Sequence, residues 1–594
     1  MEKSVYCINS RIGIIRFGVF IFTSVCFFSG TAVAVEPASP LDIEQNREKQ
    51  RQVEQETKRI LDARPSKQKE KAEITTPTLL PEGECQTINK IFLYGADQVG
   101  DSEQTTLFKE FIGQCLDNEG IAKVARVLQQ RYLEGGFITS RVSIKKTQSS
   151  LDKGNLELWV LEGYIGEFIL GSNTSFDQSR ISAAFPVASG DILNIKDLDQ
   201  GIEQLNRLFS QNFRMQIKPA DKSGYSNIIL IEILNTEKDS SRHQDKHQFS
   251  YSYSNSGSKE TGKDLHNLSL TRENLFGFND VLLFSWQRGT PYESNQKENE
   301  TLRFSASMPA GYYYYRLNYT DANTVRQVTG NTTFLSKSNI NTTQLSINRM
   351  ISRSQQYKTE VTSNIEYSDR KNFINETLVQ TSSRRIASID LGLNYTHYFN
   401  ASTLIVTPSI AQGVPWFGAI EDSSTIQEND PHAEYTLFKF YLYFRTRLTD
   451  SDLPISFQTS LNIQESSEAL YGEKQIVLGG EYSIRGYKEN VLSSNSGWTL
   501  RNDLIFPVAK ISETFKNIKW ISPLNAKLFY DTGHGASTAG SASESLSGWG
   551  VGLDYQYNGF NFSISHAKAL DTSSQFLGEE GWVTYINAGA RFTF

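Results

Sequence analysis

The sequence predicts a transmembrane β-barrel of about 16 antiparallel strands, preceded by an N-terminal helix and two repeated α+β modules. Three observations predict this arrangement. Segments of alternating apolar and polar residues run from about residue 243 to the C-terminus, an internal repeat fills residues 85–242, and the N-terminus has the features of an export signal. With 594 residues, the chain is also longer than the ~100 to 200 residues of a single domain.

Residues 1–34 are predicted to be a secretory signal peptide. Three basic residues precede an apolar run from Phe17 to Phe28, and Ala32 and Ala34 supply the small residues of a cleavage site. The apolar run is too short to cross ~30 Å of hydrocarbon as a helix. Cleavage removes three positive charges and the negative charge of Glu2, which changes the net charge from −7 to −9. This acidic balance gives no indication of a nucleic-acid partner.

The next segments are predicted to be a helix and a linker. Residues 35–62 form an N-terminal region in which Leu41–Asp62 consists of good helix formers. Its few apolar residues form no stripe wide enough to pack against a core, so we expect a solvated helix. Residues 63–84 mix Lys, Glu, Pro and Thr without a period, which is typical of a linker. Beyond residue 34 no run approaches ~18 consecutive apolar residues, so insertion into a membrane would require a closed barrel.

Residues 85–162 and 163–242 are predicted to be two copies of one α+β module, each with a short strand, two helices and a strand pair. In each copy, four apolar residues at helical spacing precede the strand pair. They are Ile121, Val124, Leu128 and Tyr132 in the first copy and Leu198, Ile202, Leu205 and Phe209 in the second. The predicted pairs are Phe137–Ile144 with Asn155–Leu161 and Phe213–Lys218 with Asn227–Ile233. The edge of such a sheet can accept a further strand from a partner polypeptide.

Two cysteines remain after signal cleavage, Cys85 and Cys115. In an oxidising compartment they can form one disulfide, which would stabilise the fold by ~3 to 4 kcal/mol on the loop-entropy model. The alternative is a pair of unpaired buried thiols.

The segment 243–594 alternates between apolar and polar residues, as in Phe249–Tyr253 and in Phe592–Phe594. A soluble β-sandwich shows the same alternation. A barrel is favoured because the segment runs for roughly 350 residues without a helical interlude, is rich in aromatic residues and ends in Phe594. At ~9 to 11 residues per tilted strand, it accommodates about 16 strands.

Three motifs in this segment occur in a known order. Leu478–Asn490 reads LGGEYSIRGYKEN, and its Arg485-Gly486-Tyr487 resembles the (V/I)RG(F/Y) tip of the sixth extracellular loop in the superfamily of barrel-assembly factors and two-partner secretion transporters. The strand motifs RNE/D and FxDxG of that superfamily are matched next. The matching residues are Arg501, Asn502 and Asp503, and then Phe529, Asp531 and Gly533.

The two upstream modules resemble POTRA domains. Further segments match the two-partner secretion transporters, the TpsB family, which includes haemolysin activation/secretion proteins. These segments are Gly136–Arg141, Leu198–Arg207 and Asn274–Asp280. The chain is therefore identified as similar to this family over nearly its whole mature length.

The resemblance implies roles for several residues. Arg485, on a loop folded back into the barrel, would pair with Asp531 on the inner wall and set the conformation of the loop. Alternatively, the pair is one of many ion pairs that hold the lumen rigid. Gly486 would permit a tight loop tip or be an ordinary turn glycine. The helix Leu41–Asp62 matches the position of a helix that occupies the pore, although a linker helix has the same composition.

The resemblance also places a disulfide within the first POTRA module of many family members, at the position of Cys85 and Cys115, which favours a structural role for the pair. It further implies the function. We expect a monomeric barrel in the lipid of the outer membrane, with the POTRA modules in the periplasm. The modules would bind an unfolded exoprotein with an N-terminal secretion domain, a haemolysin, an adhesin or a contact-dependent toxin, which leaves through the barrel as it folds outside. No enzyme activity, cofactor or metal is expected.

Three other functions compete with this interpretation. Asp531-Thr532-Gly533 is also the triplet of aspartic proteases, but that chemistry needs a second triplet, which the sequence lacks. The histidines are scattered over the barrel segment without an HExxH pair, and there is no GxSxG elbow, so His534 beside Asp531 is the single pair worth inspecting for catalysis. A barrel-assembly factor would usually carry more POTRA modules. A passive porin would lack both the modules and the Arg-Gly-Tyr tip.

Overall fold

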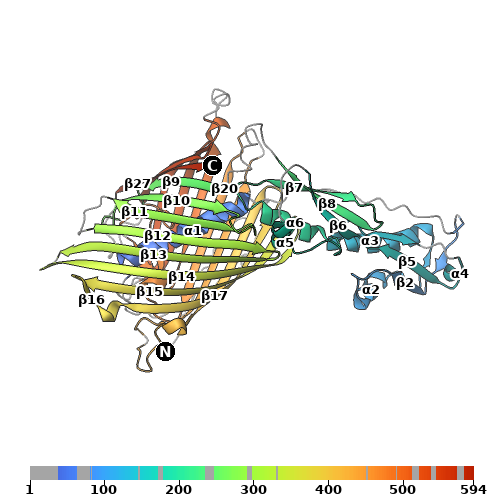
Figure 1. The fold of residues 1–594 in the computed structure, drawn as a ribbon, viewed down its shortest axis with the longest axis horizontal. Helices are drawn as coiled ribbons and strands as arrows, with labels where there is room; N and C mark the ends of the chain where they lie inside the picture. Colours follow the sequence, from blue (N-terminus) through green and yellow to red (C-terminus); the bar gives the residue numbers. More distant parts are fainter. Residues whose placement is uncertain are drawn as a thin grey trace, which may run out of the picture.

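The computed structural model describes residues 38–62, 80–144 without 82, 148–171, 178–233 and 247–594, the last without 291–296, 330–331, 428, 450–452, 490, 511–520, 537–542 and 571–580. The predicted signal peptide and most of the predicted linker lie outside the described residues. Figure 1 shows a barrel with one helix, α1 (Pro40–Asp62), inside it and two small modules at one end. Among the described helices, none combines the length and the apolar character needed to cross a membrane.

Sixteen antiparallel strands close the barrel, which confirms the predicted fold class. They are β9 (His247–Ser254), β10 (Asp264–Glu273), β11 (Val281–Thr290), β12 (Lys297–Ala310), β13 (Tyr313–Thr329), β14 (Thr333–Arg353), β15 (Tyr357–Ile374), β17 (Arg384–Tyr398), β18 (Ser402–Val414), β19 (Thr436–Arg447), β20 (Ser456–Ser466), β23 (Gly497–Pro507), β24 (Leu524–Ala536), β25 (Ser543–Tyr557), β26 (Phe560–Ala569) and β27 (Trp582–Thr593). The short β16 (Thr377–Leu378) folds onto the end of β15, which itself pairs with β17.

The first and last strands complete the closure. Phe249 of β9 lies opposite Phe592 of β27, and beyond the strand end the backbone amide and carbonyl groups of His247 and Phe594 bond to each other at 2.9 and 3.0 Å. The barrel thereby satisfies the backbone groups of both edge strands, as a hydrocarbon environment requires. Several strands exceed the expected ~9 to 11 residues, since β12 to β15 have 14, 17, 21 and 18 residues.

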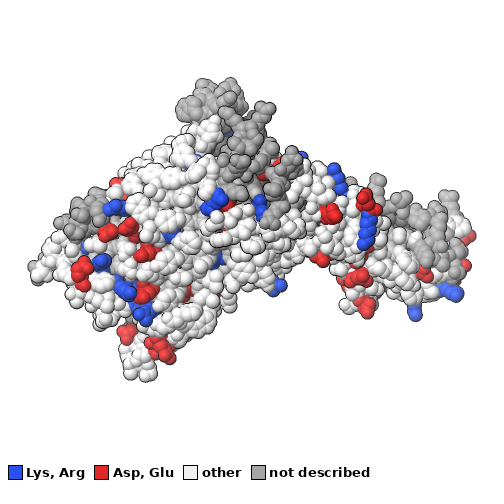
Figure 2. All heavy atoms as spheres, viewed as in Figure 1, with Lys and Arg blue, Asp and Glu red and all other residues white. Residues whose placement is uncertain are grey.

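Alternation along the strands separates an outer from an inner face. On β13 the exposed Tyr315, Leu317 and Tyr319 point outward. The face drawn in Figure 2 has a broad uncharged region over the barrel, and charged side chains gather at the end opposite the modules. An uncharged outer surface fits a barrel that faces lipid, and the exposed apolar residues of β13 lie on it.

Each module has a three-stranded sheet with its last strand in the centre, in the orders β2-β5-β4 and β6-β8-β7. The first module contains β1 (Gln86–Thr87), β2 (Lys90–Tyr94), α2 (Asp101–Phe108), β3 (Cys115–Leu116), α3 (Asn118–Gly135), β4 (Arg141–Ile144), α4 (Gln148–Leu151) and β5 (Asn155–Leu161). The second contains β6 (Tyr164–Leu170), α5 (Gln178–Ala184), α6 (Ile195–Leu205), β7 (Phe213–Pro219) and β8 (Tyr225–Glu232).

The helical residues predicted for the first module are buried on α3, which packs against the sheet. The strand predicted to begin at Phe137 begins later, at Arg141. The reason is Gly136, which ends α3 in the left-handed region with φ of 99° and is followed by a turn. At the start of α3, the carboxylate of Asp117 accepts a hydrogen bond from the backbone N–H of Gly120 at 2.8 Å.

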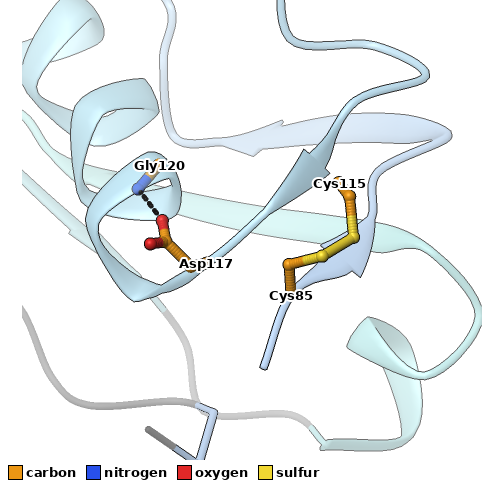
Figure 3. The surroundings of a disulfide bond; sticks show 4 residues. All are labelled: Cys85, Cys115, Asp117 and Gly120. Atoms are coloured by element: carbon orange, nitrogen blue, oxygen red, sulfur yellow. Dashed lines mark hydrogen bonds between the residues drawn. A yellow bond between two sulfur atoms is a disulfide. The ribbon is translucent and has the colours of Figure 1, made fainter. Parts of the chain in front are cut away.

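Cys85 and Cys115 are joined by a disulfide, with 5.3 Å between their Cα atoms (Figure 3). Cys115 belongs to β3, which pairs with β1 directly after Cys85. The bond therefore ties the first residues of the module to the segment that leads into α3.

Candidate functional site in the barrel lumen

The loop between β20 and β23, here called loop 6, folds back into the barrel. It contains the turn η4 (Gly472–Lys474) and the hairpin of β21 (Ile476–Leu478) and β22 (Leu492–Ser494). Apolar residues of the loop form a buried cluster with two residues of the wall. The cluster consists of Ile476, Leu478, Ile484, Tyr487, Leu492, Leu546 and Ala569. This packing fixes the loop against the inner face of β25 and β26.

Arg485 lies at the tip of loop 6 and contacts two carboxylates of the wall. Its Nε and Nη2 each donate to an oxygen of Asp531 at 2.6 Å, and its backbone N–H donates to Asp531 Oδ2 at 3.0 Å. Its Nη1 lies 2.8 Å from Asp503 Oδ1. The guanidinium also lies over the Phe529 ring, 3.6 Å from the centroid. Arg485 is 2% exposed and Asp531 0%, so the contact excludes water.

The spacing of the two strand motifs explains why these side chains meet. Phe529, Asp531 and Gly533 are two residues apart on β24 and therefore share the lumen face, as do Arg501 and Asp503 on β23. The two strands are neighbours, with Asp503 opposite Phe529 and Arg501 opposite Asp531. His534 has the other parity, points to the outer face and bonds to Ser545 instead. The structure therefore does not bring His534 and Asp531 together as a catalytic pair.

The remaining predicted residues of the tip also contact the wall. Gly486 has φ of 112°, and a Cβ there would lie 2.7 Å from the backbone nitrogen of Ala569, so both conformation and space require glycine. Tyr487 donates from its hydroxyl to the carbonyl oxygen of Ser547 at 3.2 Å. On the wall, a Cβ at Gly548 would lie 2.0 Å from the carbonyl oxygen of Arg485. Loop tip and wall therefore approach each other backbone to backbone.

Helix α1 lies in the lumen and contacts loop 6. Asn46 donates from its amide to the carbonyl oxygens of Gly472 and Gln475 at 3.2 and 3.1 Å, and Gln50 donates to that of Val477 at 2.9 Å. The expectation of a solvated helix is thus wrong for this surface. The wall and loop are themselves polar, so this side of the helix is buried without an apolar stripe, while Gln52, Val53 and Lys58 stay exposed.

Polar and charged residues of the wall contact α1 along its length. Near its C-terminal half, Arg501 of the strand motif lies 3.3 Å from Glu54, and the hydroxyls of Thr57 and Tyr441 are 3.1 Å apart. Further toward the N-terminus, Glu48 lies 3.5 Å from Arg303 of β12. The helix is therefore held to opposite parts of the wall at once.

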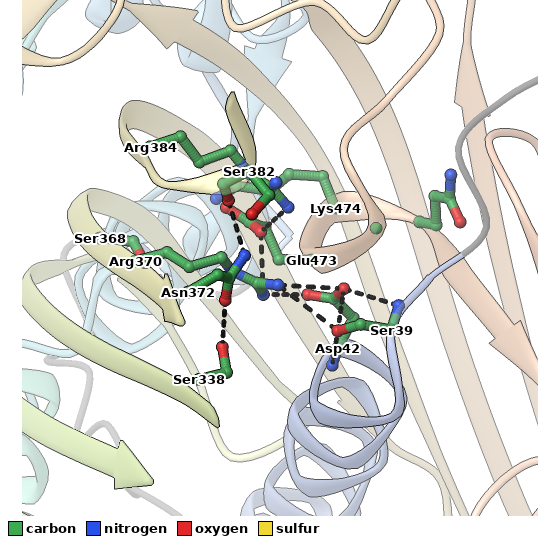
Figure 4. A network of polar contacts seen from close by, with 12 residues as sticks. Ser39, Asp42, Ser338, Ser368, Arg370, Asn372, Ser382, Arg384, Glu473 and Lys474 are labelled. Carbon is green, nitrogen blue, oxygen red and sulfur yellow. Dashed lines mark hydrogen bonds and ion pairs between the residues drawn. The ribbon is translucent and has the colours of Figure 1, made fainter. Parts of the chain in front are cut away.

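At the N-terminal end of α1, a buried network joins helix, wall and loop 6 (Figure 4). Arg370 of β15 pairs with Asp42 of α1 and, at 3.0 Å, with Glu473 of loop 6. Glu473 also pairs with Arg384 of β17 at 2.7 Å. Sequence reasoning missed this network. The sequence offers one signal for it. Glu366 and Arg370 lie four residues apart on β15, so both face the lumen, and Glu366 pairs with Lys474 of loop 6 at 2.7 Å.

The second module is docked on the barrel through α6. Glu203 lies 3.0 Å from Arg353 and 2.6 Å from Lys358, at the turn between β14 and β15. Gln200 donates to the carbonyl oxygen of Gly311 at 3.2 Å. Burial opposes ionisation of Glu203, but Lys358 and Arg353 outweigh burial and lower the pKa of its carboxyl below the usual 4.5. Gln200 and Glu203 lie in the Leu198–Arg207 segment that the sequence singled out.

The described residues contain no group of three or more His, Cys, Asp or Glu side chains that could hold a metal ion. Both oxygens of Asp531 are engaged by Arg485, whereas aspartic protease chemistry needs two acids that share a proton. The arrangement is suited to holding a loop and a helix inside a hydrated barrel.

A family model described as haemolysin secretion/activation protein ShlB/FhaC/HecB matches residues 238–555, more than half of the chain. The chain belongs to this family. In this ShlB/FhaC/HecB member, residues 86–163 match a family model of the ShlB-type POTRA domain, and residues 164–219 match a second POTRA model. The two modules are therefore POTRA domains.

Known relatives of this ShlB/FhaC/HecB member are transporters. The outer membrane transporter CdiB of Dickeya dadantii (strain 3937) is 29% identical over 77% of this chain and 79% of its own length. The hemolysin transporter protein HpmB of Proteus mirabilis is 25% identical over 73% of this chain and 74% of its own. A solved structure of CdiB from Escherichia coli matches with a TM-score of 0.81 and 25% identity, over 94% of this chain and 100% of that chain. The protein is an outer-membrane transporter of the two-partner secretion type.

Proposed function

We propose that this transporter carries an unfolded exoprotein from the periplasm to the cell surface through the barrel lumen, which opens when α1 and loop 6 move. The observation that carries this proposal is how the lumen is filled. Helix α1 is held by side-chain hydrogen bonds and ion pairs such as Asn46 to Gly472 and Arg501 to Glu54. Water and a passing polar chain can replace such contacts, whereas an apolar plug would have to be unpacked.

The POTRA domains, in the periplasm, would bind the N-terminal secretion domain of the partner by strand addition. The edge strands are β2 and β4 in the first domain and β6 and β7 in the second, and a further strand can pair with such an edge. The docking of Glu203 on Arg353 and Lys358 would hold the second domain beside the barrel entrance. Folding of the exoprotein outside the cell would give the direction of transport.

The partner would be a large exoprotein of the haemolysin, adhesin or contact-dependent toxin class. The name of one relative, the hemolysin transporter protein HpmB, supports the haemolysin class within this range. We further propose that the transporter works as a monomer in outer-membrane lipid. The gene next to that of the transporter is where the partner is to be sought.

A reversible crosslink tests the proposal. The hydroxyls of Thr57 on α1 and Tyr441 on the wall are 3.1 Å apart, so cysteines at these two positions can be joined by a thiol-reactive crosslinker that contains a reducible disulfide. We expect the crosslinked double variant Thr57→Cys/Tyr441→Cys to secrete the exoprotein only after reduction, while each single variant, treated in the same way, secretes before and after reduction. The single variants control for any effect of reduction on Cys85–Cys115. Normal secretion by the fully crosslinked double variant would contradict the proposed opening.

A further inference from the structure

The loop between β18 and β19, residues 415–435, begins with a turn that lies on the outside of the barrel. This turn is η3 (Trp416–Gly418). The Phe417 ring lies 6.3 Å from the Tyr367 ring at an interplanar angle of 86°, and the backbone N–H of Ile420 donates to the carbonyl oxygen of Arg385 at 2.9 Å. Tyr367 points outward, because Glu366 and Arg370 of the same strand face the lumen.

The turn exposes large apolar side chains at a cost in backbone energy. Phe417 is 68% exposed, Trp416 44% and Ile420 36%. Phe417 has φ of 57° and ψ of 26°, a left-handed conformation that is unfavourable for an aromatic residue. Gly418 follows with φ of 77°. Strained residues persist where the surroundings or a function require them. The backbone here turns the Phe417 ring onto the outer wall at Tyr367, and the Trp416 ring lies beside Phe417.

The turn lies at the level where the apolar outer band ends. On β15 the outward-facing residues change from Ile365 and Tyr367 to Asp369, and on β13 from Tyr319 to Asp321. The polar residues beyond this level form one row across four strands. In register the row is Asp321, Asn341, Asp369 and Arg385. Because Phe417 contacts Tyr367 and Ile420 bonds to Arg385, the turn straddles the boundary.

We propose that the turn Trp416–Ile420 is a membrane anchor that inserts into the outer leaflet where acyl chains meet head groups. The occupant is lipid because the exposed rings continue the lipid-facing band at Tyr367. Trp has an apolar ring with one N–H donor, which suits this interface. The next residues, Glu421 and Asp422, are acidic and mark the return of the loop to water.

The anchor would also fix the base of loop 6. Asp422 accepts hydrogen bonds from the His432 ring and from the backbone N–H of Ala433, each at 2.8 Å. These bonds join the first and last parts of the loop between β18 and β19. The backbone N–H of His432 then donates to the carbonyl oxygen of Ala469 at 2.9 Å, where loop 6 begins. A short path of hydrogen bonds thus joins the membrane surface to the loop that fills the lumen.

Spin labelling tests the anchor in the full-length mature protein, whose two cysteines form a disulfide and leave no thiol to label. A nitroxide is attached to Phe417→Cys, to Ser424→Cys in the exposed part of the same loop, and to Leu317→Cys on the lipid-facing wall. The accessibility of each label to oxygen and to a water-soluble nickel chelate is measured in phosphatidylcholine vesicles. We expect the oxygen-to-nickel ratio at 417 to exceed that at 424 several-fold and to approach that at 317. Equal ratios at 417 and 424 would overturn the proposal.

A second measurement leaves Phe417 intact. In vesicles with brominated acyl chains, the Trp416→Phe variant should lose part of the lipid-quenchable fluorescence of the seven tryptophans, whereas unchanged quenching would overturn the proposal. Neither measurement needs the exoprotein. A failed secretion experiment and a failed anchor are therefore distinguishable.

Discussion

Asp531 accepts hydrogen bonds both from the side chain of Arg485 and from its backbone N–H. One carboxylate therefore fixes the guanidinium and the backbone of the loop tip together. This double contact is more than the ion pair predicted from the sequence, and it determines how variants of the pair should behave.

Arg485→Ala is expected to leave the barrel inserted and to reduce secretion several-fold. Removing one partner of a buried ion pair costs ~3 to 5 kcal/mol, here in the state with loop 6 seated. Arg485→Lys keeps the charge but loses the planar fork, so its secretion should lie between those of wild type and Arg485→Ala. Insertion is measured by gel electrophoresis, in which a folded barrel migrates differently before and after heating. Wild-type secretion by Arg485→Ala would refute the conformational role.

The reversed pair Arg485→Asp with Asp531→Arg is expected to restore only part of the secretion. Asp503 lies 2.8 Å from Arg485, so the new carboxylate at 485 would face a like charge. Adding Asp503→Asn should raise secretion of the reversed pair further. No gain from this third substitution would show that Asp503 does not act on the loop.

Gly548→Ala is expected to displace loop 6 although it removes no polar contact. Its Cβ would lie 2.0 Å from the carbonyl oxygen of Arg485, and neither backbone can shift cheaply. External protease should then cleave loop 6 faster than in wild type. Gly581→Ala is a matched control, since a Cβ there meets nothing within 4 Å. Equal cleavage of both variants would contradict the backbone contact.

Asp42→Asn is expected to raise the open probability of the channel in planar bilayers. A hydrogen bond to a charged group is worth ~1.5 to 3 kcal/mol, which corresponds to roughly a ten- to hundred-fold change in the ratio of open to plugged states. Arg370 keeps Glu473 as a partner, so the barrel should stay folded. Asp369→Asn removes a neighbouring charge on the outer face and should leave conductance unchanged. Equal conductance of both variants would rule out a locking role for Asp42.

The docking of the second POTRA domain is expected to be lost only in acid. The pKa of Glu203 is lowered in the docked state by Lys358 and Arg353 despite burial, so its ionisation stabilises docking. That stability is fully present above pH 4.5 and disappears as the pH falls through the lowered pKa. Distances between spin labels on the domain and the barrel should broaden in that range. Glu203→Gln should broaden them at pH 7, and a narrow distribution in this variant would disprove the role of the carboxylate.

Spacing within one strand could be predicted from the sequence, because a period of two places Phe529, Asp531 and Gly533 on one face. The partner across the lumen could not be predicted this way. Resemblance to a family pairs Arg485 with Asp531, but the contact of Arg485 with Asp503 has no local signal, since 18 residues and a folded loop separate the two.

The placement of α1 illustrates a second limit. Its composition indicated a helix correctly, but the lack of an apolar stripe suggested exposure to solvent. Such a stripe predicts burial only where the surrounding core is apolar, and here Asp42 meets Arg370, 328 residues away, on a polar wall. The predicted strand length of ~9 to 11 residues is wrong for a related reason. Strands β13 to β15 continue beyond the lipid, where the thickness of the hydrocarbon no longer limits their length.

The unequal strand lengths give the barrel a sloping rim. From the polar row at Asp321, β13 continues to Thr329, which is about 26 Å along the strand and about 20 Å in height at a tilt of about 40°. On the other side, β9 has 8 residues and β10 has 10. An exoprotein that emerges as proposed would meet a tall wall on one side and a low edge beside the junction of β9 and β27 on the other. The exoprotein would therefore leave the barrel over that low edge, close to the bilayer surface.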